Sequence, residues 1–217
     1  MKNFRQITLL FTLFTLIGFC SVGQIISKGD ARKNEKSAKK EAKNLEKDGF
    51  YVMPGDLPIE KQLARSYARA QEEDENGYPK YVVTAANVVA ETQPAALIAA
   101  KEIAKLDIAG SMQSTIAAII ETQVANQQFN TQEAASLQKS VAASKNIIAQ
   151  KLGRLITLTE FYKKPKKSKN VEIILRVGYS EEMARKVAIS AIKEQLGEEA
   201  DDLSEQLDSL LDIDSEG

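Results

Sequence analysis

The chain has 217 residues and is close to electrical neutrality, with 29 lysines and arginines against 30 aspartates and glutamates. It contains no histidine, no tryptophan and a single cysteine, Cys20. This composition excludes Ser–His–Asp triads, Cys–His nucleophilic pairs and zinc sites of the usual histidine and cysteine kind, because each needs residues that are missing. No cofactor is predicted, and catalysis would have to rely on carboxylates, lysines, tyrosines and serines.

Residues 1–23 show the pattern of a secretion signal. A charged start, Lys2 and Arg5, precedes an apolar core over residues 7–19. Small residues occupy the positions that signal peptidase recognises, so the mature chain is predicted to begin at Gln24. We therefore expect an exported protein, periplasmic or associated with the outer membrane, for which nucleic acid is a poor partner.

Cys20 offers an alternative, the covalent lipid anchor of an outer-membrane lipoprotein. The residue before a lipidated cysteine is normally small, but Phe19 occupies that position. Cleavage before Gln24 is therefore favoured. The mature chain then has no cysteine, and no disulfide can form.

Charge is distributed unevenly along the mature chain. Residues 24–48 are rich in lysine with hardly an apolar face, and we expect a basic linker or a frayed helix there. Residues 198–217 form an acidic tail. Between them, residues 49–197 are predicted to be a single α+β domain, which is long enough for a real core. Nothing in the sequence indicates the oligomeric state.

The longest predicted element is a helix over residues 94–126. Its apolar residues recur three and four positions apart, as on the buried side of a helix. They form two neighbouring rows, so we expect the helix to be packed on nearly every side. Five charged residues within it argue against a membrane span, which needs about 20 mostly apolar residues. The first row contains Ala99, Ile103, Leu106, Gly110, Ala117, Ile120 and Val124, and the second contains Ile108, Met112, Ile116 and Ile119.

Shorter elements flank this helix and define the fold class. In chain order they are a docking segment over 49–56, a helix over 57–74, a strand over 78–91, a second helix over 130–152, two strands over 154–162 and 171–179 that form a hairpin, and a closing helix over 181–196. This order predicts an α+β fold. We expect an antiparallel sheet of about three strands, packed on one face against a long Ala-rich helical hairpin and the closing helix.

The helix AALIAAKEIAKLDIAGSMQSTIAAII, the second helix and the strand pair resemble a known family. This is the small membrane-associated lipoprotein family founded on a twenty-kilodalton surface antigen of the bacterial cell envelope. The resemblance covers residues 78–196 and rests on element order and helix composition, without a sharp motif. It implies an envelope location and no established catalytic site, so no functional residue can be transferred. Phe19 departs from the family, because it disfavours the lipid attachment that gives the family its name.

Three acidic residues are the candidates for an enzyme. Glu91, Glu160 and Glu172 lie at the end of the first strand and on the two strands of the hairpin, and could lie near one another. Two carboxyl groups at a suitable separation can act as acid and base on a glycan. The ordinary alternative is that these residues face solvent and pair with lysines or with Arg176.

A dense group of lysines is the candidate binding site. Five lysines surround Pro165 in the predicted hairpin connection, where they should project into water from one tip. They could contact an anionic surface of the envelope, such as lipid or peptidoglycan carboxylates. The ordinary alternative is a solubilising turn that also protects the sheet. The five residues are Lys163, Lys164, Lys166, Lys167 and Lys169.

Two classes of function therefore follow from the sequence. The favoured one is a non-enzymatic exported cell-envelope protein that binds an envelope protein or an anionic surface, and the alternative is a glycan hydrolase that uses acids alone. A concave pocket with convergent carboxylates would favour the hydrolase. An exposed apolar patch or an uncovered sheet edge would favour the binding protein.

Overall fold

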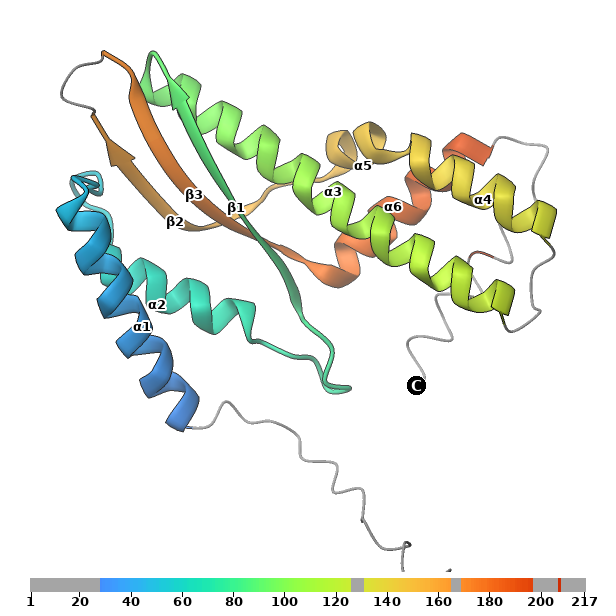
Figure 1. The fold of residues 1–217 in the computed structure, drawn as a ribbon, viewed down its shortest axis with the longest axis horizontal. Coiled ribbons are helices and arrows are strands. Elements are labelled where there is room, and N and C mark those ends of the chain that lie inside the picture. Colours follow the sequence, from blue (N-terminus) through green and yellow to red (C-terminus); the bar gives the residue numbers. More distant parts are fainter. Residues whose placement is uncertain (1–27, 126–130, 165–168, 197–206, 208–217) are drawn as a thin grey trace, which may run out of the picture.

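The computed structural model describes residues 28–125, 131–164, 169–196 and 207, and it has the predicted α+β fold (Figure 1). Three antiparallel strands form one sheet in the order β1-β3-β2, so the strand that comes last in the chain lies in the middle. The predicted hairpin is confirmed. The strands are β1 (Tyr81–Ala90), β2 (Ile156–Lys163) and β3 (Val171–Ser180).

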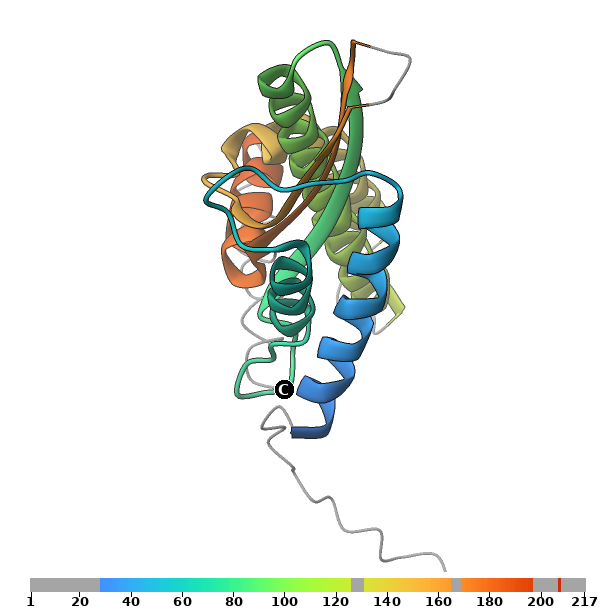
Figure 2. The ribbon, with the colours of Figure 1, turned by 90° about the vertical axis from the view of Figure 1, so that its left-hand side faces the viewer.

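Helices cover both faces of the sheet, although only one covered face was predicted (Figure 2). Neighbouring residues of a strand point to opposite faces, and here they enter different cores. Tyr162 and Ile173 belong to the main core with α3 to α6, whereas Phe161 packs in a smaller core with α1 and α2. The helices are α1 (Lys28–Lys47), α2 (Ile59–Ala70), α3 (Gln93–Ala125), α4 (Thr131–Ala143), α5 (Lys145–Lys151) and α6 (Glu181–Leu196).

The long helix α3 is buried along one row, and the prediction of cover on nearly every side was wrong. The row advances by four residues at each step and therefore winds slowly around the helix. Its N-terminal alanines lie on the sheet and its C-terminal isoleucines lie against the other helices. The alanines let the sheet approach closely and leave larger side chains outside, with Ile98, Ile103 and Leu106 exposed by 64%, 41% and 36%. The buried row is Ala96, Ala100, Ala104, Ile108, Met112, Ile116 and Ile120, and Ala109 beside it is also buried.

The stretch Gln93–Thr122 of α3 is long and apolar enough to meet a simple criterion for a membrane span. Core helices of folded domains meet the same criterion. Ala100 and Ala104 are fully buried, and the helix packs on β1 and β3. We therefore describe α3 as the core helix of this fold.

The second predicted helix is broken in two at Ser144. Ser144 is buried, and its hydroxyl donates to the carbonyl oxygen of Val141 at 2.8 Å. Such a local hydrogen bond competes with the helical pattern. From α3, the Gln113 side chain donates to the carbonyl oxygens of Val141 and Ala142 at the same break. The two pieces still bury one apolar row in the core: Ala134, Leu137, Val141, Ile148 and Leu152.

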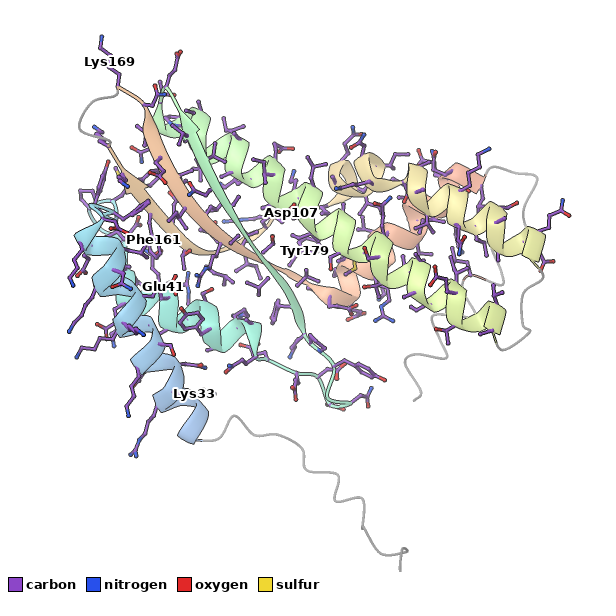
Figure 3. The ribbon with its side chains drawn as sticks, viewed as in Figure 1. Lys33, Glu41, Asp107, Phe161, Lys169 and Tyr179 are labelled. Carbon is purple, nitrogen blue, oxygen red and sulfur yellow. The ribbon has the colours of Figure 1, made fainter. Side chains whose placement is uncertain are left out.

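Lys28–Lys47 of the basic segment form a docked helix, α1, which corrects the prediction of a linker or frayed helix. Ala38 and Ala42 of α1 are buried against the smaller core. Glu41 accepts a hydrogen bond from the Arg176 guanidinium on β3 at 2.6 Å, and another from the Tyr67 hydroxyl on α2. Figure 3 shows Glu41 on α1 among the elements that it joins. Few apolar residues of α1 contact the core, and the contact that joins it to α2 and β3 is the polar side chain of Glu41. Apolar periodicity in the sequence therefore did not indicate that this helix is docked.

The predicted acidic tail lies mostly outside the described residues. Leu207 is the exception, with 1% of its surface exposed in the main core. At least this point of the tail therefore belongs to the folded domain.

Burial along α3 gives a first prediction. Ile120→Ala should lower the free energy of unfolding by about 2–4 kcal/mol, because it leaves a cavity in a filled core. Ile98→Ala on the same helix should change it by less than about 0.5 kcal/mol, since Ile98 is mostly in water. Reversible denaturant unfolding measures both. Equal losses from the two substitutions would contradict the single buried row.

Gly110 gives a second prediction. A glycine inside a helix suggests close packing by the second helix, but a Cβ atom here would meet only the flexible end of Lys145, at 3.4 Å. Gly110→Ala should therefore raise the free energy of unfolding by about 0.5–1 kcal/mol, the usual gain in helix propensity. Thermal and denaturant unfolding measure it. A loss of stability would show that the site is tighter than the Lys145 contact implies.

Candidate functional site

The outer edge of β2 is covered by other parts of the chain. Tyr51 and Tyr162 exchange backbone hydrogen bonds of 2.8 and 2.9 Å across this edge. The Gln62 side chain accepts from the backbone N–H of Glu160 at 2.8 Å, and the Arg65 guanidinium donates to the carbonyl oxygen of Thr157 at 2.9 Å. The predicted docking segment and α2 therefore satisfy the polar groups of this edge.

Two hydrogen bonds show which backbone groups of β1 point away from the sheet. The N–H of Glu181 donates to the carbonyl oxygen of Lys80 at 3.1 Å, so the N–H of Tyr81, on the other side of that trans peptide, points away from β3. On β3, the backbone N–H of Arg176 donates to the side-chain hydroxyl of Thr159 on β2 at 3.1 Å, so it points away from β1. Its partner on β1, Ala85, therefore belongs to a pair without mutual hydrogen bonds.

The register of β1 with β3 is unbroken from end to end. The direction of the backbone groups therefore alternates regularly along the whole strand. The backbone N–H and C=O groups of every second residue point away from the sheet. Within the part of the chain that the structure describes, no protein group hydrogen-bonds to them. The five residues are Tyr81, Val83, Ala85, Asn87 and Val89.

This edge also lacks the usual protection against strand addition. Proteins blunt free edges with lysine, proline, bulges or very short strands. The β1 sequence YVVTAANVVA is 10 residues long and contains no charge and no proline. Ala85, Asn87 and Val89 are exposed, Val89 by 56%. An uncharged edge of this length is a template for another strand.

An exposed apolar side chain of α3, Ile103, lies beside the same edge. Asp107 lies 3.5 Å from the Thr84 hydroxyl, which places that side of α3 against β1 (Figure 3). Ile103 is one helical turn earlier on the same side and is 41% exposed. The free backbone groups of β1 are therefore accompanied by exposed apolar surface.

The lysine group differs from its prediction. Lys163 does not project freely, because its ammonium lies 3.5 Å from the Glu172 carboxylate and 5.1 Å from the centre of the Phe50 ring. Lys164 and Lys169 are exposed at the hairpin tip, where Figure 3 shows Lys169 pointing outward. Lys166 and Lys167 lie outside the described residues.

The three candidate acids do not come together. Glu160 is paired with Leu175, whose side chain is in the main core, whereas Glu172 is paired with Lys163 on the opposite face of the sheet. Glu91 is exposed beyond the end of β1. In the described ranges, no group of three or more acidic side chains gathers that could hold a metal ion.

Glu160 has a structural partner in the core. It accepts a hydrogen bond of 2.5 Å from the Tyr162 hydroxyl. Burial of the ring, reinforced by this hydrogen bond, raises the pKa of Tyr162 to about 12. The Tyr162 phenol therefore stays neutral into the alkaline range, and its hydrogen bond to Glu160 fixes the end of β2 against the core.

Comparison with known proteins gives no match to any family model, to any curated protein or to any solved structure. The resemblance to the small lipoprotein family therefore stays a prediction. The site must be judged on its own geometry.

The phenol of Tyr162 gives a third prediction. Its pKa is raised from 10.0 to about 12 in the folded protein, so its contribution to stability is complete below pH 10 and is lost as the pH rises through 12. The native chain should therefore lose more stability across this range than Tyr162→Phe, which has no proton to release. Denaturant unfolding at a series of alkaline pH values measures the difference. Parallel pH profiles for the two proteins would contradict the raised pKa.

Proposed function

We propose that this protein is a non-enzymatic, exported cell-envelope protein that binds a partner polypeptide by accepting an extended segment along β1. The observation that carries the proposal is the free edge of β1, with its outward backbone groups and its uncharged side chains. Strand addition uses such groups for affinity and the alternating side chains for specificity.

The contrast between the two edges supports one docking site per chain. The β2 edge is occupied by Tyr51, Gln62 and Arg65. The β1 edge is flanked by exposed Val89 and Ile103, which add apolar contact to main-chain hydrogen bonds. An arriving segment would therefore find both kinds of interaction at one place.

The alternatives are less well supported. A glycan hydrolase needs two carboxyl groups roughly 5–10 Å apart that face each other across one substrate site, whereas Glu160 and Glu172 lie on opposite faces of the sheet. An anionic-surface contact through the lysines is weakened because Lys163 is already held by Glu172. The location in the envelope rests on the pattern of residues 1–23.

Site-specific photocrosslinking in the source cells tests the proposal. A photoreactive residue at position 89 should give an adduct of one discrete size, because a partner strand would lie against it. The same residue at position 57 is the matched control, since Leu57 is 50% exposed and Val89 is 56% exposed. Position 57 should give no adduct.

A second substitution ties the adduct to the edge. Ala85→Lys puts a charge in the middle of β1, where it opposes strand addition, and should abolish the adduct formed at position 89. Leu57→Lys should leave it unchanged. An adduct that survives Ala85→Lys, or equal adducts from positions 57 and 89, would rule out the β1 edge as the binding site.

A further inference from the structure

We propose that the segment accepted by β1 is the β1 strand of a second copy of this chain, in an antiparallel pair. This inference rests on the proposed function and names its partner. The product is a twofold-symmetric dimer in which the two sheets join edge to edge.

Symmetry and hydrogen bonding restrict the pairing. Two antiparallel strands related by a twofold axis keep each face of the sheet continuous, so residues of equal parity stand opposite each other. The outward groups belong to the odd-numbered residues Tyr81 to Val89. Pairing centred on Ala85 matches every outward N–H of one copy with an outward C=O of the other, and no other centre matches them all.

The side chains accept this register. Ala85 meets Ala85 at the axis, Val83 meets Asn87, and Tyr81 meets Val89, an aromatic and β-branched pair of the kind that stabilises sheets. Val89 would thereby cover its exposed surface with the Tyr81 ring, which also lies 4.5 Å from the Arg69 guanidinium, measured to the ring centre. No charge faces another within the paired strands.

The ends of the strand are complementary only in the antiparallel direction. Lys80 precedes β1 and Glu91 follows it, and both are exposed. In the Ala85-centred pair, Lys80 of one copy lies one position from Glu91 of the other, at both ends of the interface. A parallel pair would instead set the two Lys80 side chains together.

The helix α3 adds apolar contact to the joined strands. Both copies of α3 would lie on the same face of the joined sheet, because the axis is normal to it. Asp107 is beside Thr84, and Ile103, one turn earlier, lies toward the middle of β1. The exposed Ile103 side chains of the two copies would therefore flank the axis.

Association through this edge closes at two copies. Within the ranges that the structure describes, each chain has one free strand edge, since β2 is covered by α2 and by Tyr51. A chain with two free edges would continue into a fibre. A second copy therefore satisfies the free edge and leaves none for further addition.

Sedimentation equilibrium of the mature chain tests the proposal. The native protein and Leu57→Lys should form dimers. Ala85→Lys should dissociate at concentrations at least about tenfold higher than the native dimer, because it sets two like charges opposite each other at the axis. Ala85→Glu should do the same, and an equimolar mixture of the two variants should recover the dimer through an opposite-charge pair. Recovery also shows that each variant is folded.

Spin labelling tests the register separately. The mature chain without Cys20 has no cysteine, so Val89→Cys can be labelled alone. Two labels eight residues apart along the paired strands should be about 27 Å apart. Labels on Leu57→Cys should not show that distance.

The outcomes distinguish this inference from the proposed function. A native chain that stays monomeric at high concentration, or a dimer unaffected by Ala85→Lys, overturns self-pairing. If a photocrosslink from position 89 to a different polypeptide then persists, the β1 edge remains a binding site for that partner. If that adduct is also missing, both proposals fail.

Discussion

The need to satisfy backbone polar groups at the edges of a three-stranded sheet is the constraint on which the rest of this structure depends. The middle strand, β3, meets it through its two neighbours. The β2 strand meets it only because α2 and the segment before it are docked. That docking in turn uses α1, whose Glu41 joins Tyr67 of α2 to Arg176 of β3. The β1 strand is left as the one edge without a protein partner among the described residues.

The sequence predicts the helices and strands well, but it does not predict that β1 lies at an open edge of the sheet. The β1 segment is identified as a strand by its valine, tyrosine and threonine content. The same uncharged composition is typical of a strand buried in the middle of a sheet. Its position at the edge follows from pairing with β3, which is distant in the chain. Local pattern carries no information on that pairing, so the principal candidate site could not be found from sequence.

Burial on α3 and α1 shows a second limit of pattern reading. Hydrophobic periodicity predicts that Ile103 and Leu106 are buried, whereas the sheet packs against Ala100 and Ala104. Alanine allows the closer approach, and an exposed isoleucine costs a folded protein little. On α1 the decisive contact is the Glu41 carboxylate. Apolar spacing cannot indicate a polar anchor whose partners come from distant segments.

The covered edge and the open edge have a joint consequence. An unprotected ten-residue strand is an aggregation hazard when its partner can expose another free edge in turn. Covering β2 removes that possibility for pairing between copies of this chain, so β1 can remain uncharged without these copies propagating a sheet. The hydrogen bonds of Gln62 and Arg65 to β2 therefore do more than hold α2 in place. When a second copy of this chain pairs at β1, the covered β2 edges leave no further strand edge open among the described residues, so the joined sheet stays finite.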